Sequence, residues 1–547
     1  MTKKNSSKKF IIDIYLKFVK KNGRHPSTSE MLKMGVSRDK IRHHYGSISE
    51  LKEQARNNYP KIFNKIIDET LFEPQKFTKI EKDIDNYDRF VITTAVTGCE
   101  LHENFYKALK NYCKRNKALL LILPCSDPAA NVSWNFDTRL SNEYFVGHDL
   151  TLSKNIHIRM IQLSAKQIKP TTGLQRLSQK DGAFIYASPK QFLEYVPISG
   201  EKLPHSIMTP GAITKSNYDT DKYMSKRTAY LANFDHIVGA VVVEIDKDER
   251  YYFRQVQAEP KSGAFIDLGI RYTSNGKIQK VPAEAFILGD YHSGEHDETA
   301  KATWKEVIDY VGVKNIIGHD VYNGRSVNHH DKDKRITRAK KALSEQISLE
   351  KEFELTCKEV NEICSWIPGK FIWVKSNHDE VLDRYLQEAR YLDDDINLRL
   401  ASQLIRPMID GLDPLKYAME NLTKLCEGPH LKKGLKIEQI KNPKKIIWLC
   451  RDHDYKIAGV ECGAHGDKGP NGAGASMTAF EKAYGSCIIG HAHTPGILRN
   501  VYRVGTTSKL RLDYNIGASS WLHTSCLLYP NGSRQLINSI RGKWRKK

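Results

Sequence analysis

The chain has 547 residues, a formal net charge of +21 and an apolar content of 40%. This length exceeds what a single hydrophobic core supports and indicates about three domains. No apolar run approaches the roughly 20 residues that cross a bilayer, and the N-terminus lacks the apolar core of a signal peptide. The ten cysteines are scattered without a CxxC pair, which predicts reduced thiols. The composition excludes an integral membrane protein, and we expect a cytoplasmic one.

Positive charge is concentrated in three segments. Residues 1–60 hold 14 Lys and Arg against 5 Asp and Glu, and residues 325–341 hold 7 against 2. The last seven residues, RGKWRKK, add five basic residues and no acidic one. Focused positive charge of this kind suits a polyanion such as nucleic acid. Solvated basic termini would give the same pattern, so the charge is informative only beside the motifs described below.

Residues 1–60 are expected to form a small helical module. Gly35-Val36-Ser37 predicts a tight turn between two short helices, with Ser37 capping a second helix that runs through His44. This is the helix-turn-helix plan, whose second helix enters the major groove. The frame GRxP…YGS…L also resembles the small DNA-binding repeats associated with homing endonucleases. We expect a DNA-binding arm; a helical docking arm is the alternative. The DNA contacts would come from Arg38, Lys40, Arg42 and His43.

Between this arm and the second half of the chain, the pattern predicts a helical linker and an α/β accessory domain. The polar segment 61–85 is the linker, and 86–280 is the accessory domain. In it, the apolar runs 89–96 and 118–124 flank an amphipathic stretch at 103–116, which predicts a βαβ unit. Residues 200–285 alternate further strands, one of them at 264–270, with turns. We find no reactive constellation in this part of the sequence, and its role stays open.

Five short motifs in the second half of the chain share one design. Each carries Asp, Asn or His, and four of them directly follow a β-branched or aromatic run that predicts a buried strand. Helical stretches lie between the first blocks, and the one after the second block runs over 336–366. Polar side chains at the carboxyl ends of strands form the sites of α/β folds. We therefore predict that the five blocks converge on one site for hard metal ions. They are ILGDYH at 287–292, IIGHD at 316–320, VKSNHDE at 374–380, CGAHGD at 462–467 and IIGHAH at 488–493.

This order of motifs resembles the calcineurin-like metallophosphoesterases. The resemblance implies a metallophosphoesterase domain at residues 281–535, followed by a basic tail at 536–547. The resemblance implies an α/β (α+β) fold built as a double β-sandwich flanked by helices, with two divalent metal ions in its site. It assigns the first metal to Asp290, His292, Asp320 and His493. It assigns the second metal to Asp320, Asn377, His465 and His491.

The same resemblance assigns the chemistry of the site. Two cations that share a bridging carboxylate can clamp a phosphate ester and activate a water. His378 would be the acid for the leaving oxygen, with Asp379 orienting it. A donor set of nitrogen and oxygen without thiolate favours Mn²⁺, with Mg²⁺, Fe and Zn²⁺ as alternatives. His319, His329, His330 and His453 are expected not to be ligands.

Two positions depart from the family pattern. The second block usually has Gly-Asp, whereas this chain has Gly318-His319-Asp320, which predicts a bulged strand end and leaves the role of His319 open. In the DNA-repair exonuclease branch (SbcD-like), a histidine stands three residues after the bridging Asp. Here that place holds Asn323, which we expect at the substrate. The change puts a 3′-exonuclease polarity in doubt, though not phosphodiester hydrolysis.

The basic segment 325–341 starts two residues after Asn323, so it is tethered at the rim of the predicted site. We expect it to hold a phosphate backbone; a solvated helix start is the alternative. Residues 496–540 have strand and turn character and would close the sandwich, with the basic tail trailing beyond. The expected DNA contacts of the segment are Arg325, Lys334, Arg335 and Arg338.

These features together predict a metal-dependent DNase that acts by a two-metal mechanism. The arrangement is similar to the pre-early nucleases with which virulent tailed bacteriophages degrade host DNA, which implies a homo-oligomer in the cytoplasm of an infected bacterium. One alternative is a phosphoprotein phosphatase or small-molecule phosphodiesterase, which the same five blocks would serve. A second alternative is a non-catalytic DNA-binding protein on a phosphoesterase scaffold.

Overall fold

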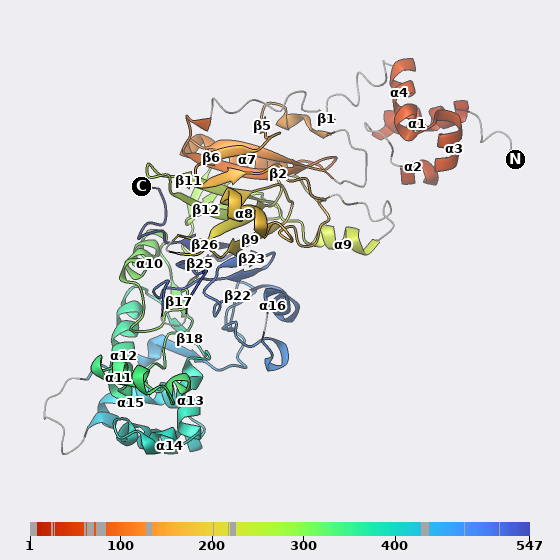
Figure 1. Cartoon of the computed structure of the whole chain (residues 1–547). Coiled ribbons are helices and arrows are strands. Elements are labelled where there is room, and N and C mark those ends of the chain that lie inside the picture. Colours follow the sequence, from red (N-terminus) through yellow and green to blue (C-terminus); the bar gives the residue numbers. More distant parts are fainter. Residues whose placement is uncertain are drawn as a thin grey trace.

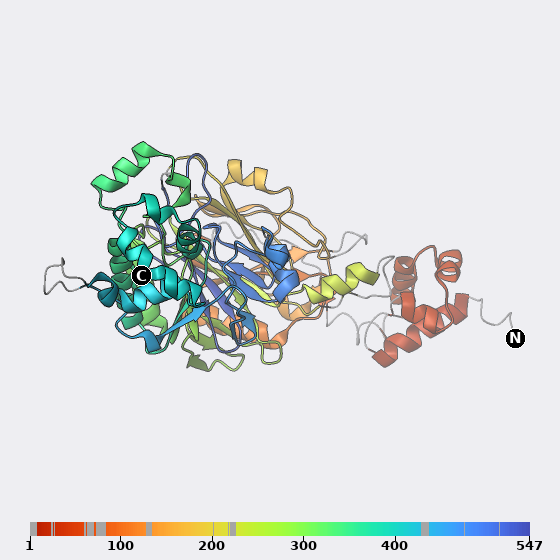
Figure 2. The same ribbon diagram turned by 90° about the horizontal axis from the view of Figure 1, so that it is seen from below.

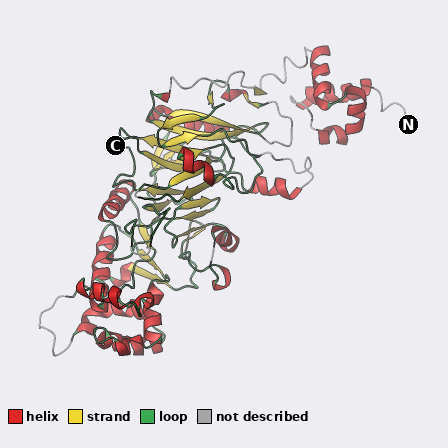
Figure 3. Cartoon of the chain, in the orientation of Figure 1, coloured by secondary structure: helices red, strands yellow, loops and turns green. Residues whose placement is uncertain are grey.

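The fold is a mixed α/β one with several sheets, as predicted (Figures 1 and 3). Helices α1–α4 lie at one end and α11–α15 at the other, with the sheets between them (Figures 1 and 2). The predicted helical linker falls largely outside the described residues, and within it Leu71–Phe72 form the short strand β1. The computed structural model describes residues 8–22, 26, 28–59, 62, 71–72, 84–126, 134–200, 202–216, 218, 226–427, 437–474, 476–512 and 515–546.

The N-terminal helices pack around a core of their own, which includes Tyr15, Met31 and Ile41. The predicted turn is present: Gly35 has a φ of 87°, and the Ser37 hydroxyl accepts a hydrogen bond from the backbone N–H of Lys40 at 3.3 Å. The helix after it ends at Tyr45, one residue later than expected. The four helices are α1 (Lys8–Asn22), α2 (Thr28–Lys33), α3 (Arg38–Tyr45) and α4 (Ile48–Asn58).

A five-stranded sheet contains the predicted βαβ unit, because β2 and β3 pair in parallel and α7 connects them. The stretch expected as one strand at 264–270 is two strands, since Leu268 and Gly269 both have positive φ and turn the chain. The sheet order is β12-β11-β2-β3-β5. The bounds are β2 (Arg89–Val96), α7 (Glu103–Asn116), β3 (Leu119–Cys125), β5 (Tyr144–Phe145), β11 (Gly239–Ile245) and β12 (Tyr251–Gln257). Beside it lie β13 (Phe265–Asp267), β14 (Ile270–Tyr272) and β15 (Ile278–Lys280).

A six-stranded sheet carries the first three motif blocks. Its strands β16 to β19 are parallel, so their carboxyl ends meet at one edge. Side chains alternate across it: Ala285 and Ile287 enter the core shared with the other sheets, whereas Phe286 enters the core beneath the helices. The order is β19 (Ile446–Leu449), β18 (Phe371–Val374), β17 (Asn315–Gly318), β16 (Ala285–Ile287), β25 (Thr524–Leu528) and β26 (Arg534–Asn538).

Helices cover the outer face of this sheet. The stretch 336–366, expected to be one helical run, is interrupted at Glu345, whose φ is 58°, and Ser348 then caps a new helix by accepting from Lys351 N at 3.3 Å. The helices are α10 (Glu298–Val311), α11 (Arg335–Leu343), α12 (Leu349–Ser365), α13 (Asp379–Gln387), α14 (Leu398–Ile409) and α15 (Pro414–Cys426). In the part of the chain that the structure describes, no helix has both the length and the apolar character needed to cross a bilayer.

A ten-stranded sheet joins the two halves of the chain. Strand β9 pairs antiparallel with β23, so segments on both sides of residue 280 share one sheet and one core. The predicted accessory segment and the segment with the motifs therefore contribute strands to one continuous β-sheet. The order is β20 (Lys456–Ile457), β21 (Val460–Glu461), β22 (Cys487–Ile489), β24 (Val501–Arg503), β23 (Gly496–Leu498), β9 (Gln191–Val196), β10 (His205–Pro210), β8 (Ala183–Ile185), β7 (Ile156–Ile158) and β6 (Leu150–Ser153). The short helices α8 (Gln175–Asp181), α9 (Lys226–Phe234) and α16 (Met477–Tyr484) flank it.

The C-terminal basic segment was expected to trail beyond the sheets, and this is wrong. Trp544 is 2% exposed, and the Arg545 guanidinium lies 3.9 Å from the centre of the Tyr310 ring. The backbone N–H of Lys546 donates to Glu244 of the five-stranded sheet at 3.2 Å. An apolar anchor within the basic run thus packs the described part of the tail against the body.

Candidate metal centre

The five blocks meet where the parallel strands of the six-stranded sheet end, beside the ends of β21 and β22. Asp290 and His292 follow β16, Asp320 follows β17, and Asn377 follows β18. From the ten-stranded sheet, His465 follows β21, and His491 and His493 follow β22. Asp or His side chains from all five blocks therefore lie close together, as the sequence predicted.

The backbone holds the first two blocks in register past the end of their strands. The N–H of His292 donates to the carbonyl of Asp320 at 2.7 Å, and the N–H of Tyr291 donates to that of His319 at 3.0 Å. Four of the converging residues have positive φ, which costs a side chain roughly 1–3 kcal/mol and is concentrated at functional sites. They are His292 (52°), Asp320 (45°), His491 (70°) and His493 (55°).

The Asp320 carboxylate is the common member of three groups whose ligand atoms lie within 4.8 Å of one another. Its Oδ2 is 3.2 Å from His465 Nε2 and 3.7 Å from His292 Nε2. In turn His493 Nε2 is 3.1 Å from His292 Nε2 and 3.2 Å from Asp290 Oδ2. The groups are His292, Asp320 and His378; Asp320, His465 and His491; and Asp290, Asp320 and His493. A carboxylate shared in this way is what a bridging ligand between two cations requires.

Several buried oxygen atoms that could bind a cation have no hydrogen-bond partner among the described residues. Asp290 Oδ1, Asp320 Oδ1 and Asn377 Oδ1 make no hydrogen bond to the described residues. Burying such an atom unsatisfied costs free energy, so an unpaired set of this kind needs an explanation. Gly490 adds to the crowding, because a Cβ there would lie 2.4 Å from Asp290 Oδ1. The cluster offers nitrogen and oxygen ligand atoms, which suit a hard or borderline divalent cation.

Burial and mutual charge set the protonation of the cluster. Burial opposes ionisation of Asp320, but the charge of His465 outweighs it and holds the pKa of Asp320 well below its ordinary value. For His465, burial acts to lower the pKa, but Asp320 prevails and raises it to about 9. Burial and the neighbouring His378 lower the pKa of His292 to about 3, so this imidazole is neutral. Cations bind ionised carboxylates and neutral imidazoles, so Asp320 and His292 have the required forms, whereas His465 must release its proton when a cation binds.

His378 is half-buried, and its ring centre lies 4.5 Å from that of His292. Its Nδ1 donates to the backbone carbonyl of Asn323 at 2.7 Å, which leaves Nε2 for the site. Asp379, expected to orient His378, instead accepts from Ser376 N at 2.9 Å and from Trp373 Nε1 at 3.2 Å. The orienting contact therefore comes from Asn323, the residue expected at the substrate.

Two residues that the sequence left without a role touch the cluster. His319 is fully buried, and its Nδ1 lies 3.4 Å from His465 Nδ1. The ring centre of Trp521 lies 4.1 Å from that of His493. The departure from Gly-Asp in the second block was a signal for His319, whereas Trp521 lies outside all five blocks.

The residues expected to contact DNA differ in their surroundings. Arg325 is ion-paired with Glu295, whereas Arg335 and Arg338 on α11 are exposed. Lys334 is exposed and lies 3.5 Å from Asp331. In the N-terminal module, Arg38, Arg42 and His43 are exposed on α3, and Lys40 is half-buried.

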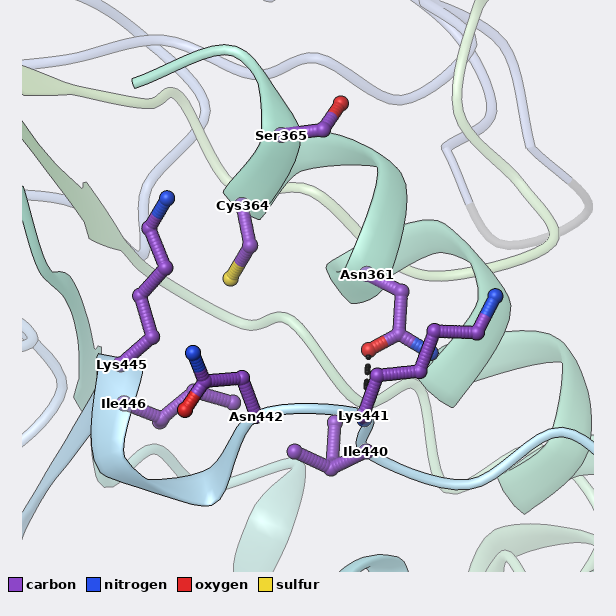
Figure 4. A pocket seen from close by; sticks show the side chains of 8 residues that line it. All are labelled: Asn361, Cys364, Ser365, Ile440, Lys441, Asn442, Lys445 and Ile446. Atoms are coloured by element: carbon purple, nitrogen blue, oxygen red, sulfur yellow. Dashed lines mark hydrogen bonds between the residues drawn. The ribbon is translucent and has the colours of Figure 1, made fainter. Parts of the chain in front are cut away.

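A pocket of about 170 Å³ lies apart from these residues, between α12 and the segment 440–446 (Figure 4). Asn361 Oδ1 accepts from the backbone N–H of Lys441 at 3.0 Å, so this oxygen of the pocket lining is already in a hydrogen bond within the chain. No residue that we predicted for the site lines this pocket. The lining residues are Asn361, Cys364, Ser365, Ile440, Lys441, Asn442, Lys445 and Ile446.

Comparison with known proteins gives one relative. No protein-family model and no solved structure matches the chain. It is 28% identical over 490 residues to Protein A1 of Escherichia phage T5, a match that covers 83% of this chain and 82% of that protein. The chain is therefore similar to a bacteriophage protein over most of its length.

Proposed function

We propose that this chain is a metal-dependent DNase of the calcineurin-like metallophosphoesterase type, which hydrolyses DNA phosphodiester bonds with two divalent cations, Mn²⁺ first among them. The observation that carries the proposal is the convergence of five separate sequence blocks on the shared carboxylate of Asp320. The substrate that we propose is host DNA in the cytoplasm of an infected bacterium. The similarity to a phage protein supports this choice. The homo-oligomer expected from the resemblance stays a prediction.

The family resemblance divides the ligands between the two cations. Asp290, His292 and His493 would hold one cation, and Asn377, His465 and His491 the other, with Asp320 common to both. A cation pair supplies an activated water and neutralises the charge that develops on the phosphate. The cluster has the donor types and the unpaired buried oxygens for this task.

His378 is the general acid in this proposal. The Asn323 carbonyl fixes its ring through Nδ1, so that in the protonated imidazole Nε2 presents a proton to the leaving oxygen. The buried Asp379 holds the start of α13, on which His378 depends for its position. We assign Asp379 this structural task in place of a direct contact to His378.

DNA as the substrate is supported by charge outside the cluster. Exposed Arg335 and Arg338 lie on α11, in the segment that follows Asn323. The helix-turn-helix geometry of α2 and α3, with Arg38 and Arg42 exposed on α3, offers a second contact to the duplex. Phosphate contacts of this type supply most of the sequence-independent affinity for DNA.

The test is hydrolysis by the full-length protein with Mn²⁺, Mg²⁺ or Zn²⁺, on linear duplex, circular duplex and single-stranded DNA, with p-nitrophenyl phosphate as a monoester. We expect Mn²⁺-dependent cleavage of DNA that His378→Ala reduces by about 10²–10⁴-fold, the usual contribution of a general acid. The exposed His330→Ala is the matched control and should cleave as the native protein does. Cleavage of the monoester alone would assign the cluster to a phosphatase, and DNA binding without cleavage would assign the chain to non-catalytic proteins.

A further inference from the structure

The loop that precedes β25 borders the candidate metal centre on two sides. At its start, the N–H of Thr507 donates to the carbonyl of Asp290 at 2.8 Å, and that of Lys509 donates to the carbonyl of Glu295 at 2.9 Å. At its end, the N–H of Leu522 donates to the carbonyl of His493 at 3.2 Å. Residues 505–512 and 515–522, here named the rim loop, are therefore tied to the first and fifth blocks.

The accessory segment fixes the middle of the rim loop. Ser519 and Ile198 exchange backbone hydrogen bonds of 3.0 and 3.1 Å, and Arg511 donates to the carbonyl of Gly200 at 2.6 Å. Nearer the centre, the hydroxyls of Ser520 and Thr494 are 2.7 Å apart. These contacts give the end of the rim loop a defined position beside the metal ligands.

Trp521 is the residue that this scaffold places at the centre. Its ring meets that of His493 edge to face, with 4.1 Å between the ring centres and 61° between the planes. The indole is half-buried, so part of it reaches the surface next to a ligand of the cluster. A phosphodiester bound at the cluster would have its adjoining nucleoside within reach of this ring.

The charge around the rim loop suits the same ligand. Lys509 and Arg325 both pair with the single carboxylate of Glu295, three residues after His292. The Lys509 side chain is 57% exposed, so its ammonium group also faces solvent beside the cluster. This favours a strand that carries a phosphate on each side of the reacting one.

We propose that Trp521 is a nucleobase platform: it stacks on the base of a nucleotide that adjoins the scissile phosphate. The inference rests on the proposed DNase function and names the part of the substrate that the site reads. Stacking is tolerant of sequence because every base has a π face, so the platform selects nucleic acid over phosphoprotein or a simple phosphate ester without selecting a sequence. The accessory segment then has a task in substrate binding, because it fastens the loop that carries the platform.

The experiment pairs protein variants with abasic DNA. Oligodeoxynucleotides with one abasic site, moved stepwise along the strand relative to the cut, are hydrolysed by native protein, Trp521→Phe and Trp521→Leu with Mn²⁺. In the native protein we expect kcat/KM to fall about 5- to 100-fold when the abasic site occupies one position next to the cut. Trp521→Leu should lose a similar factor on intact DNA and nothing further on that abasic strand, whereas Trp521→Phe keeps most of the native rate.

Two further measurements separate stacking from support of the metal ligand. Mn²⁺ affinity, measured by titration calorimetry without DNA, should stay within about twofold in Trp521→Leu. Trp134→Leu, which removes another half-buried tryptophan that packs on Phe136 in a different core, should cleave both DNAs as the native protein does.

The inference is overturned if Trp521→Leu remains as sensitive to the abasic site as the native protein, or if its only defect is weaker Mn²⁺ binding. Failure of the native protein to cleave any DNA is a distinct result, seen before any variant is compared, and it rejects the DNase function and this inference together.

Discussion

At the scale of single residues, the centre depends on Asp320, because its carboxylate belongs to all three groups of potential ligands. Replacing it with Asn keeps the shape of the side chain but removes the negative charge that two cations would share. We expect Asp320→Asn to lose more activity than the 10- to 100-fold typical of a residue that only supports a ligand. The measurement is Mn²⁺ stoichiometry of the full-length protein by atomic emission, together with DNA cleavage.

The expected stoichiometry is two Mn²⁺ for the native protein and fewer for Asp320→Asn. Circular dichroism of both proteins is the control for folding. Native stoichiometry together with native turnover in the variant would remove Asp320 from the centre.

His319 gives a second prediction at this scale. Its Nδ1 lies 3.4 Å from His465 Nδ1, so one ring donates to the other, and His465 keeps Nε2 directed at Asp320. Metal-bound histidines are commonly oriented by such a partner. His319→Phe fills the buried site but cannot form the bond, and we expect Mn²⁺ affinity to fall about 10- to 100-fold. Titration calorimetry measures this, with the exposed His330→Phe as control; equal affinities in the two variants would show that His319 only fills space.

Local sequence pattern was sufficient to bring together the Asp and His side chains that are potential ligands, because four of the five blocks directly follow a β-branched or aromatic run and strand ends in parallel sheets meet at one edge. It was not sufficient for the neighbours of these ligands. The carbonyl that orients His378 belongs to the backbone of Asn323, 55 residues away, and no side-chain pattern records it. Asp379 was misassigned because the direction of its side chain depends on Trp373 and the turn at Ser376.

At the scale of elements, α11 projects exposed basic side chains into solvent, while its own attachment is buried. Lys341, 8% exposed, donates to Asp331 at 2.6 Å and to the Arg325 carbonyl at 2.7 Å, so it holds the segment in place. Arg335 and Arg338 are exposed and have the freedom to contact phosphates. The segment thus combines a residue that anchors it with exposed residues that we propose to contact DNA, and its sequence alone does not separate the two.

Arg335→Ala with Arg338→Ala should therefore weaken DNA binding without changing the hydrolysis of a small diester. Each lost phosphate contact lowers the slope of log K against log salt by about 0.9, so the pair should lower it by up to about 1.8. Fluorescence anisotropy across a salt series measures the slope. Lys114→Ala with Arg115→Ala, which removes two exposed charges from α7, is the matched control, and an equal change in both pairs would reject a specific role for α11.

Elements with a strong local period were predicted well, since α7 and β2 have the bounds that their apolar patterns indicated. The break between α11 and α12 was missed because Glu345 adopts positive φ, a conformation that its residue type does not favour. The pairing of β9 with β23 joins residues about 300 positions apart. Tertiary packing determines which strand pairs with β9, and the local sequence pattern does not carry this information.

At the scale of the whole molecule, a buried ionic cluster links three of the sheets. Arg254, 2% exposed, contacts Asp267 at 2.7 Å and Glu244 at 3.1 Å. Gln535 of β26, in the six-stranded sheet, donates to the same Asp267 carboxylate at 3.1 Å. The cluster therefore connects the accessory segment to the sheet that carries the motifs, and its ionisation affects the stability of both.

Burial opposes ionisation of Asp267 and Glu244, but the charge of Arg254 outweighs it and lowers the pKa of both carboxyl groups. A carboxyl whose pKa is lower in the folded chain than its unfolded value of about 4 stabilises the fold above that pH. This contribution is lost as the pH falls from about 4 through the folded pKa. We therefore expect the midpoint of thermal unfolding to fall between pH 5 and pH 3.5.

Asp267→Asn tests the origin of this dependence. It leaves Arg254 buried with one anion, so we expect a loss of about 3–5 kcal/mol at pH 7. The variant should also lose less stability than the native chain between pH 5 and pH 3.5, because one titrating carboxyl is gone. Unfolding in urea at each pH measures both effects. Asp454→Asn, at an exposed carboxylate, should follow the native curve; an Asp267→Asn curve parallel to the native one would place the acid sensitivity elsewhere in the molecule.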